Sequence, residues 1–352
     1  MSEMSPLRIA VLGAGGLGKA AARIIGLKRE VRLVAICDSQ GFVTCPDGLD
    51  GEAISELAGN LVEGYRAHRT RAVGAGGVVV EIEDAEALRC DDPIGALVQR
   101  ADSFDAVLIA LPNLPNEFIP GVIERFANAN RSLAFVDVLK RTRAVEQMFA
   151  LDPLVRDARS VVLTGCGATP GLLAAAAVLA AQSFIEVERV DIWWGVGIAN
   201  WDAYKATIRE DIAHLPGYTV EQAKAMTDAE VEALLERTDG VLTLRGMEHA
   251  DDLLLQRVGV VGDLGQVEVG GVMDTRHPKK PVSTTMTLTG ITFEGQRSAT
   301  SFSSAMRRPW RPTSSDRPSA TSSAASGSSS GASSASSAAP SSCPWSSSNP
   351  VQ

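Results

Sequence analysis

The first half of the chain alternates short apolar runs with longer segments in which apolar residues recur every three or four positions. The apolar runs predict strands at Arg8–Leu12, Arg32–Cys37, Gly77–Glu81, Ala106–Ala110, Leu133–Asp137 and Ser160–Leu163. The periodic segments predict helices at Gly15–Gly26, Leu49–Leu61, Pro93–Gln99, Phe118–Ala127 and Ala144–Ala158. Alternating strands and helices are typical of a doubly wound parallel sheet, so residues 1–165 are predicted to form an α/β domain.

The pattern changes beyond an Ala-rich helix predicted at Leu173–Ala181. Strands are predicted at Val187–Gly197, Val267–Val272 and Ser283–Thr292, and a polar helix at Val220–Arg237. Residues 166–297 are therefore interpreted as an α+β second domain with an open mixed sheet, used for substrate binding or dimerisation.

The last part of the chain, residues 298–352, has a different composition. Serine makes up 21 of the 52 residues from Ser301 to Gln352, and no Ile, Leu or Val precedes Val351. Such a segment cannot bury enough apolar surface to fold, so it is predicted to be disordered. Ser, Ala, Arg and Pro are also what a GC-rich gene yields out of frame. We therefore favour a frameshift as the origin of this tail over a genuine linker.

A glycine-rich corner joins the first predicted strand to the first predicted helix. It reads Gly13-Ala14-Gly15-Gly16-Leu17-Gly18 and has the GxGxxG spacing of a Rossmann dinucleotide site. The first two glycines of the motif allow a tight turn and close approach to the pyrophosphate, which then faces the positive end of the helix dipole. The alternative is a flexible loop without a ligand.

An acidic residue stands where a dinucleotide site needs one. Asp38 ends the second predicted strand about 20 residues after the glycines, where a carboxylate binds a ribose 2′-hydroxyl. The predicted cofactor is NAD or NADP, with NAD favoured because Asp38 would repel a 2′-phosphate. Ser39, Lys28 and Arg29 leave NADP open.

The net charge of −9 and the pI near 5.1 argue against nucleic acid or an anionic membrane as a partner. No apolar run is long enough for a membrane helix, and no signal peptide is predicted. The five cysteines and four histidines are scattered without metal-ligand spacing, so no metal site and a reducing, cytoplasmic setting are expected. We interpret each histidine as a surface or packing residue.

Three further stretches stand at the predicted carboxyl ends of strands, where open α/β sheets bind ligands. The first is Leu111, Pro112 and Asn113, which we predict to lie beside the nicotinamide or to form a plain turn. Lys140 follows the next strand and is the candidate proton donor, although it also fits a solvated lysine at a helix start.

The third stretch, Thr164–Leu172, is predicted to bind a substrate carboxylate through backbone amides. Its candidate residues are Gly165, Cys166, Gly167, Thr169 and Gly171. Cys166 has no histidine nearby in sequence and is interpreted as a packing residue rather than a nucleophile. Arg276, in a polar loop between predicted strands, is a second candidate for the carboxylate, or part of a solvated connection.

The glycine corner, the Gly165–Gly171 turn and the segment Asp274–Thr285 together resemble saccharopine dehydrogenase-like oxidoreductases. The resemblance covers residues 7–297 and implies an NAD(P)-dependent enzyme that transfers hydride to or from a C=N or C=O group of an amino-acid-derived substrate. Asp38-Ser-Gln-Gly41, the segment Pro46–Asp50 and Lys140 also resemble homoserine dehydrogenase, which acts on an aldehyde or alcohol.

Two other functions stay open. A protein that binds a dinucleotide without turnover fits the small number of acid and base candidates. A frameshifted chain that has lost its activity fits the tail. The expected partner is a small amino-acid-like substrate, and a homodimer through the second sheet is a further expectation.

Overall fold

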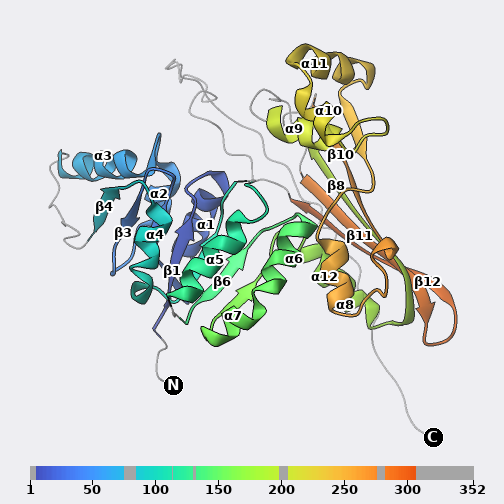
Figure 1. The fold of residues 1–352 in the computed structure, drawn as a ribbon, viewed down its shortest axis with the longest axis horizontal. Coiled ribbons are helices and arrows are strands. Elements are labelled where there is room, and N and C mark those ends of the chain that lie inside the picture. The colour runs from blue at the N-terminus through green and yellow to red at the C-terminus, as the bar shows by residue number, and fades with distance from the viewer. Residues whose placement is uncertain are drawn as a thin grey trace, which may run out of the picture. The chain divides into compact units, whose positions relative to one another are not determined.

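A computed structural model describes residues 5–74, 85–112, 114–129, 132–197, 205–275 and 282–306. It confirms an α/β fold in which a parallel-rich sheet is followed by a second, mixed sheet (Figure 1). The strand predicted at Gly77–Glu81 and most of the serine-rich tail lie outside the described residues. Among the described helices, none is long and apolar enough to cross a membrane.

The first sheet has seven strands in the order β4-β3-β2-β1-β5-β6-β7. They are β1 (Leu7–Leu12), β2 (Val31–Cys37), β3 (Gly41–Thr44), β4 (Glu86–Arg89), β5 (Ala106–Ile109), β6 (Ala134–Asp137) and β7 (Val161–Leu163). The adjacent strands β2, β1, β5, β6 and β7 run parallel to one another, as predicted. The strands β3 and β4 were not predicted and run antiparallel to their neighbours.

Helices pack on both faces of this sheet because successive strand residues point to opposite sides. The helices are α1 (Gly16–Gly26), α2 (Gly51–Glu56), α3 (Leu61–Gly74), α4 (Pro93–Val98), α5 (Phe118–Asn128), α6 (Thr142–Ala150) and α7 (Asp152–Asp157). Leu12 belongs to the core beneath α4 and α5, and Val11 to the core beneath α1 and α2. Both residues are fully buried, which fixes the register of β1.

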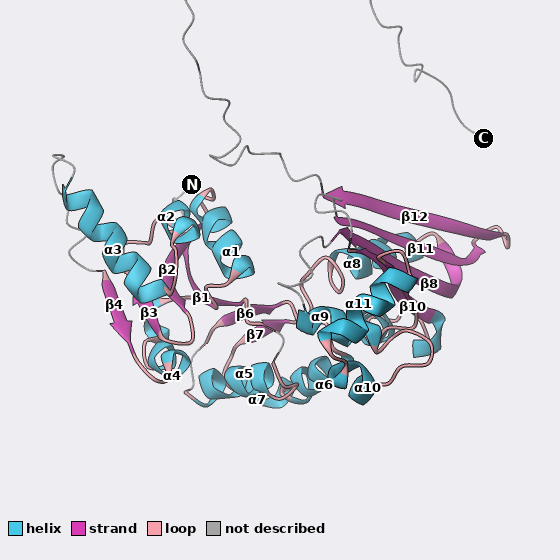
Figure 2. Ribbon diagram, turned by 90° about the horizontal axis from the view of Figure 1, so that it is seen from above, coloured by secondary structure: helices cyan, strands magenta, loops and turns pink. Residues whose placement is uncertain are grey.

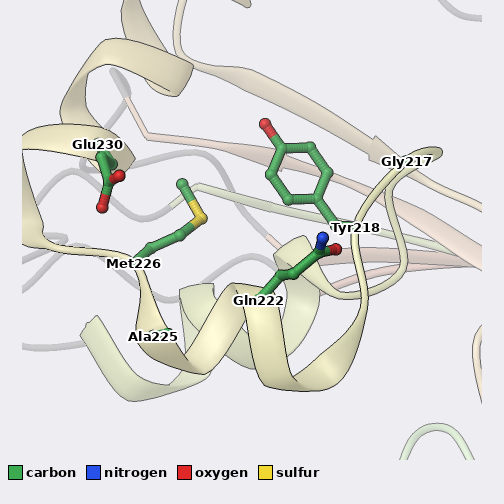
Figure 3. Close-up of a pocket in the computed structure, with 6 residues that line it drawn as sticks. All are labelled: Gly217, Tyr218, Gln222, Ala225, Met226 and Glu230. Atoms are coloured by element: carbon green, nitrogen blue, oxygen red, sulfur yellow. The ribbon is translucent and has the colours of Figure 1, made fainter.

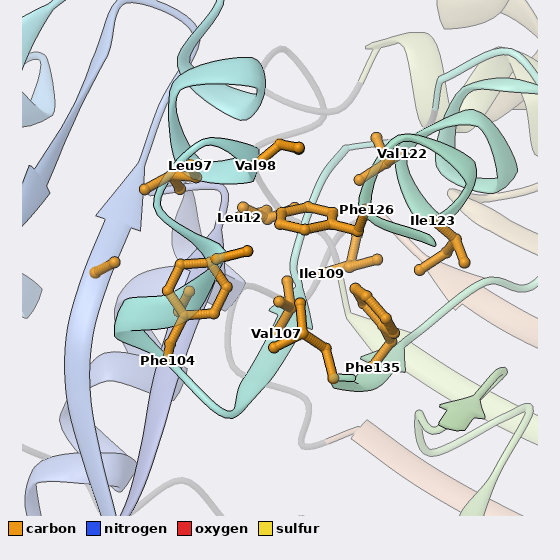
Figure 4. Close-up of a cluster of buried hydrophobic side chains, with 14 of the residues drawn as sticks. Leu12, Leu97, Val98, Phe104, Val107, Ile109, Val122, Ile123, Phe126 and Phe135 are labelled. Atoms are coloured by element: carbon orange, nitrogen blue, oxygen red, sulfur yellow. The ribbon is translucent and has the colours of Figure 1, made fainter. Parts of the chain in front are cut away.

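Three aromatic rings form the centre of the larger core (Figure 4). The ring of Phe126 on α5 lies 6.2 Å from that of Phe104, at an edge-to-face angle, and 5.6 Å from that of Phe135 on β6. Fully burying such a side chain contributes about 1.5–3 kcal/mol. The core therefore lies between α5 and the strands whose carboxyl ends carry the candidate site.

Two of the helices predicted in this part of the chain differ from the observed ones, each for a local reason. The segment Leu49–Leu61 forms only the short α2, which begins after Asp50, whose carboxylate accepts hydrogen bonds from the Glu52 and Ala53 amides. The helix predicted at Ala144–Ala158 is split into α6 and α7, where Pro153 stands in the first turn of α7 and has no N–H to continue the first helix.

The second sheet has five strands in the order β12-β11-β8-β10-β9 (Figure 2). Its strands are β8 (Phe184–Gly197), β9 (Val241–Leu244), β10 (Val267–Asp274), β11 (Val282–Thr292) and β12 (Arg297–Met306). Only β8 and β10 pair in parallel, so the sheet is mixed, as predicted. The strand β12 includes the residues from Ser298 to Met306, so the predicted tail overlapped a strand that pairs with β11.

The helices of the second part are α8 (Leu172–Ala181), α9 (Lys205–Ile212), α10 (Val220–Ala225), α11 (Asp228–Arg237) and α12 (Asp251–Arg257). The helix predicted at Val220–Arg237 is broken between α10 and α11. There Met226 is extended and Thr227 begins a new helix through a capping box with Glu230. Apolar residues of α8 and α12 pack on one face of the sheet together with Ile192 and Met286.

Candidate functional site

The glycine corner has the geometry that a dinucleotide site requires. Gly13 has a φ of 108°, and a Cβ there would lie 2.4 Å from the Ala110 carbonyl oxygen. A Cβ on Gly18 would lie 1.7 Å from the Gly13 carbonyl oxygen, so α1 packs directly against the turn. Both positions therefore need glycine. By contrast, the space around Gly15 and Gly16 is open.

The amino end of α1 has the features of an anion-binding site. Gly15 is the N-cap residue and no side chain caps the helix. The first turn also contains no acidic residue. The first backbone N–H groups and the positive end of the dipole are thus unopposed by any carboxylate of the helix itself. With the open space at Gly15 and Gly16, this end of α1 fits a pyrophosphate.

The Asp38 carboxylate accepts hydrogen bonds from backbone amides that the sequence did not predict. Its Oδ1 accepts hydrogen bonds from the amides of Gln40 (2.8 Å) and Gly41 (3.1 Å), and its Oδ2 accepts one from Leu61 (2.8 Å). The carboxylate therefore holds the turn into β3 and the start of α3. Ser39 lies exposed in the same turn. A role of Asp38 at a ribose stays a prediction.

A small cavity lies at the carboxyl ends of β5 and β6. Its volume is about 150 Å³, and it is lined by Leu111 and Pro112 after β5 and by Lys140 and Arg141 after β6. The structure thus brings together two of the predicted stretches. Asn113 lies outside the described residues.

Lys140 interacts with two titratable residues near the end of α9, Asp211 and His214. The half-buried Lys140 interacts electrostatically with Asp211 and with His214. Burial raises the pKa of Asp211 to about 6, partly offset by the Lys140 charge, and Glu210 raises it further. Burial also lowers the pKa of His214, with Lys140 adding to the effect. Lys140 therefore lies within electrostatic range of a carboxyl group and an imidazole.

Asp137, at the end of β6, holds the predicted carboxylate-binding loop. Its Oδ1 accepts hydrogen bonds from the amides of Leu139 (2.9 Å) and Gly165 (3.0 Å) and from the Thr164 hydroxyl (3.0 Å). Burial raises its pKa, which these hydrogen bonds partly counter. Oδ2 is buried and has no hydrogen-bond partner among the described residues.

The five candidate residues of this loop share one compact turn that begins after β7 and leads into α8. Gly167 and Gly171 form an isolated β-bridge, and the Leu172 amide donates to the Gly167 carbonyl. Burial and the nearby Asp137 charge raise the pKa of Cys166. A thiol with a raised pKa is a poor nucleophile, but Cys166 is exposed, so the structure does not support its interpretation as a packing residue.

One buried pair was missed by the sequence interpretation. His249 Nδ1 lies 2.8 Å from Asp251 Oδ2, and the two side chains are 5% and 0% exposed. The same Oδ2 accepts a 2.6 Å hydrogen bond from the Thr169 hydroxyl, and the amide of Ala250 donates to the Lys140 carbonyl at 2.8 Å. His249 is buried next to this carboxylate, but its Nδ1 has no hydrogen-bond partner among the described residues. The His-x-Asp spacing was the only signal in the sequence.

The 150 Å³ cavity is lined by Lys140 but not by Asp211 or His214, and His214 instead lines a cavity of about 550 Å³ beside Arg245. Other cavities are present in the described part of the chain. One of about 380 Å³ lies around α10, where the Tyr218 ring and the Met226 side chain extend into the same space (Figure 3). Its acidic residue, Glu230, accepts hydrogen bonds from Thr227, which lower its pKa. Within the described ranges, no group of three or more His, Cys, Asp or Glu side chains has the arrangement of a metal site. Arg276 lies outside these ranges.

The chain is similar to a protein of Haloferax mediterranei, (S)-8-amino-7-oxononanoate synthase BioU. The two are 42% identical over 310 residues, which cover 85% of this chain and 88% of the relative. No family model matches the chain.

The chain is also similar to solved structures at low sequence identity. Saccharopine dehydrogenase from Saccharomyces cerevisiae has a TM-score of 0.50 and 9% identity, with 85% of each chain covered. A meso-DAPDH mutant from Clostridium tetani has a TM-score of 0.44 and 13% identity, covering 85% of this chain and 83% of that one.

These findings correct the family assignment. The saccharopine dehydrogenase-like assignment is wrong, and so is the secondary likeness to homoserine dehydrogenase, because the relative at 42% identity has another function. At 9% identity, saccharopine dehydrogenase is similar in fold alone. The glycine corner and the turn that suggested these families are features that many enzymes of this architecture share.

Proposed function

The chain belongs to the BioU family, and from that premise we propose that it is an enzyme that binds (S)-8-amino-7-oxononanoate or a closely similar compound and acts on it. The observation that carries the proposal is 42% identity over nearly the whole length of the relative. The named compound has a carboxylate at one end of an aliphatic chain and, near the other end, a ketone beside an amine. Its ketone and amine need proton donors and acceptors, and its carboxylate needs an anion site.

We propose that a nicotinamide dinucleotide binds at the glycine corner. The open space at Gly15 and Gly16 and the uncapped end of α1 fit its pyrophosphate. Ala14 and Leu17 complete the corner, and Leu111, Pro112 and Asn113 would border the nicotinamide. When bound, such a cofactor supplies a hydride or accepts one.

NAD is the proposed form of the cofactor. Three backbone N–H groups donate hydrogen bonds to the negatively charged Asp38 carboxylate. That charge would oppose the 2′-phosphate of NADP. Binding of both dinucleotides to the same preparation tests the preference, with at least ten-fold weaker binding of NADPH as the expected result.

Lys140 is the proposed proton donor to the substrate ketone. It lines the cavity beside Pro112 and interacts electrostatically with Asp211. The turn from Gly165 to Gly171 and Arg276 are proposed to bind the substrate carboxylate through backbone amides and a guanidinium group. We place the enzyme in a reducing, cytoplasmic setting, since the four described cysteines are free thiols.

The test uses the full chain, both reduced dinucleotides and (S)-8-amino-7-oxononanoate. We expect this compound to bind and to be converted, as followed by calorimetry and mass spectrometry. Nonanoate, which lacks the amine and the ketone, should bind more weakly and stay unchanged. Lys140→Met keeps the length of the side chain and should lose conversion while it still binds the dinucleotide. If the compound neither binds nor reacts with either cofactor, the proposal is wrong.

A further inference from the structure

We propose that Arg141 is a catalytic residue that binds the ketone oxygen of the substrate in the cavity beside Lys140, and that Glu210 is the positioning residue that holds its guanidinium group. The inference deepens the proposed function and rests on it for the identity of the substrate. Lys140 supplies a proton to the ketone oxygen, but a second group is needed to hold that oxygen and to stabilise the negative charge that forms on it.

The side chains that line this cavity favour an oxygen acceptor. Its two charged residues are Lys140 and Arg141, and no carboxylate of a described residue lines it. The third polar side chain is that of Asn116, and the other lining residues are apolar or proline. A cationic cavity of about 150 Å³ has room for a carbonyl group and a few neighbouring carbon atoms. It favours a group that becomes negative over an ammonium group.

Arg141 has hydrogen-bond donors left for a substrate. Its Nη1 donates to the Leu114 carbonyl at 3.1 Å and to Asn116 Oδ1 at 3.3 Å, and its Nη2 lies 3.4 Å from Glu210 Oε1. A guanidinium group has five N–H groups, so these three acceptors leave two of them without an acceptor among the described residues. Leu114 and Asn116 line the same cavity, so the guanidinium group lies at its wall.

Consecutive acidic residues of α9 balance the two cations from outside the cavity. Glu210 pairs with Arg141 at 3.4 Å, and Asp211 interacts electrostatically with Lys140. Neither carboxylate lines the cavity. Each therefore offsets part of the cost of holding a cation away from water, without occupying the space that the substrate needs. Glu210 is 69 positions from Arg141 in the chain, so the second part of the chain fixes the guanidinium group.

The ketone oxygen becomes negative when a hydride is added to the ketone carbon. A C–H bond forms at that carbon, and the π electron pair of the C=O bond moves to the oxygen. The N–H groups of Arg141 stabilise this charge, and Lys140 then gives the oxygen a proton. The product is an alcohol, the reduced dinucleotide is oxidised, and Lys140 regains its proton from water. Arg141 stays charged throughout, because a guanidinium group does not lose its proton in proteins.

The first experiment replaces Arg141 by Met. We expect kcat to fall about 100-fold or more, the usual loss when one donor to a developing oxyanion is removed, while KM changes by less than about three-fold. The Kd of the dinucleotide should change by less than about two-fold. Added guanidine, at concentrations that leave the protein folded, should restore part of the activity of Arg141→Ala. Arg143→Met, at an exposed position of α6, is the matched control and should behave as wild type.

A ketone without a carboxylate shows which oxygen Arg141 binds. 2-Amino-3-nonanone has the same amino ketone on a chain of the same length. Arg141→Met should lower kcat/KM for this compound by the same factor, within about three-fold, as for (S)-8-amino-7-oxononanoate. If the variant converts the carboxylate-free ketone as well as the wild type does, Arg141 binds the substrate carboxylate instead and the inference is wrong.

A double-variant cycle tests the positioning role. Glu210→Gln keeps the size of the side chain and removes its charge, and it should lower kcat about three-fold or more. The double variant Arg141→Met/Glu210→Gln should be no slower than Arg141→Met alone, because Glu210 acts through the guanidinium group. Losses that multiply would overturn the positioning role of Glu210.

A measurement without substrate separates this inference from the proposed function. Acetate is small enough for the cavity and presents oxygen acceptors to Arg141. At matched ionic strength, acetate should raise the midpoint of thermal unfolding of the wild type but not that of Arg141→Met, because a ligand stabilises only the protein that binds it. Equal shifts in the two proteins, or no shift in the wild type, would overturn the inference. A wild type that binds acetate through Arg141 but does not act on the amino ketone would overturn the proposed function alone.

Discussion

The hydroxyl of Thr169 donates a 2.6 Å hydrogen bond to Oδ2 of Asp251. Thr169 lies in the glycine-rich turn before α8, and Asp251 begins α12, 82 positions later in the chain. This bond connects the turn proposed to bind the substrate carboxylate with the start of α12. The proposed anion site therefore depends on a segment far along the chain.

Replacing Thr169 by Val should destabilise the protein by about 1–3 kcal/mol, because a buried carboxylate oxygen loses its hydroxyl partner. Urea unfolding monitored by circular dichroism measures the loss. Thr142→Val is the control, since the Thr142 hydroxyl lies 3.5 Å from Asp252 at the limit of hydrogen bonding. A control as unstable as the Thr169 variant would contradict the importance of the Thr169–Asp251 bond.

Replacing Gly16 by Asp should weaken dinucleotide binding at least ten-fold, about 1.4 kcal/mol. The open space at Gly16 accepts the side chain, and a carboxylate at the start of α1 suits the helix dipole, so folding should be unaffected. The loss comes from repulsion of the pyrophosphate. Gly16→Asn has nearly the same size without the charge and should bind more tightly than the Asp variant. Fluorescence titration with NADH compares the two, and equal affinities would argue against a phosphate at this end of α1.

Asp211→Asn should make stability less dependent on pH. Burial raises the pKa of this carboxyl group from 3.8 to about 6, so the folded protein binds its proton more tightly than the unfolded chain does. Because of this group, the free energy of unfolding of the wild type falls by about 3 kcal/mol in total as pH rises from 3.8 to about 6. The variant should be more stable than wild type above pH 6, with a difference that shrinks at lower pH. Denaturant unfolding measures the free energy of unfolding of wild type and variant across this pH range. Parallel curves of stability against pH for the two proteins would contradict the prediction.

Phe126→Ala should cost about 3–5 kcal/mol of stability, because it leaves a cavity between the rings of Phe104 and Phe135. Phe293, which is 68% exposed, is the matched control, and its replacement by Ala should change stability by less than about 0.5 kcal/mol. Thermal unfolding of the two variants side by side provides the comparison, and similar losses would place the core elsewhere.

Local signals in the sequence predicted the first sheet well. The corner from Gly13 to Gly18 is specified within six residues, because close contacts of turn, strand and helix demand glycine there. The strand β3 has only four residues, Gly41–Thr44, and follows a turn held by Asp38. A run that short has no periodicity of its own, so this antiparallel addition was not predictable from pattern.

The site could be predicted only in part. Pro112 and Lys140 each follow a recognisable strand, and parallel strands bring such ends together. Asp211 and His249 come from the second part of the chain, and only tertiary contacts place them near Lys140. For Asp38, the sequence spacing predicted a bond to a ribose. In the structure its carboxylate accepts three backbone hydrogen bonds, which the sequence did not predict.

The hydrogen bond from the Ala250 amide to the Lys140 carbonyl also limits how this enzyme can open. A hinge that separated the two sheets at this point would have to break that bond and the Thr169–Asp251 bond together. The two hydrogen bonds therefore hold the loop after β6, the turn before α8 and the start of α12 together as one unit.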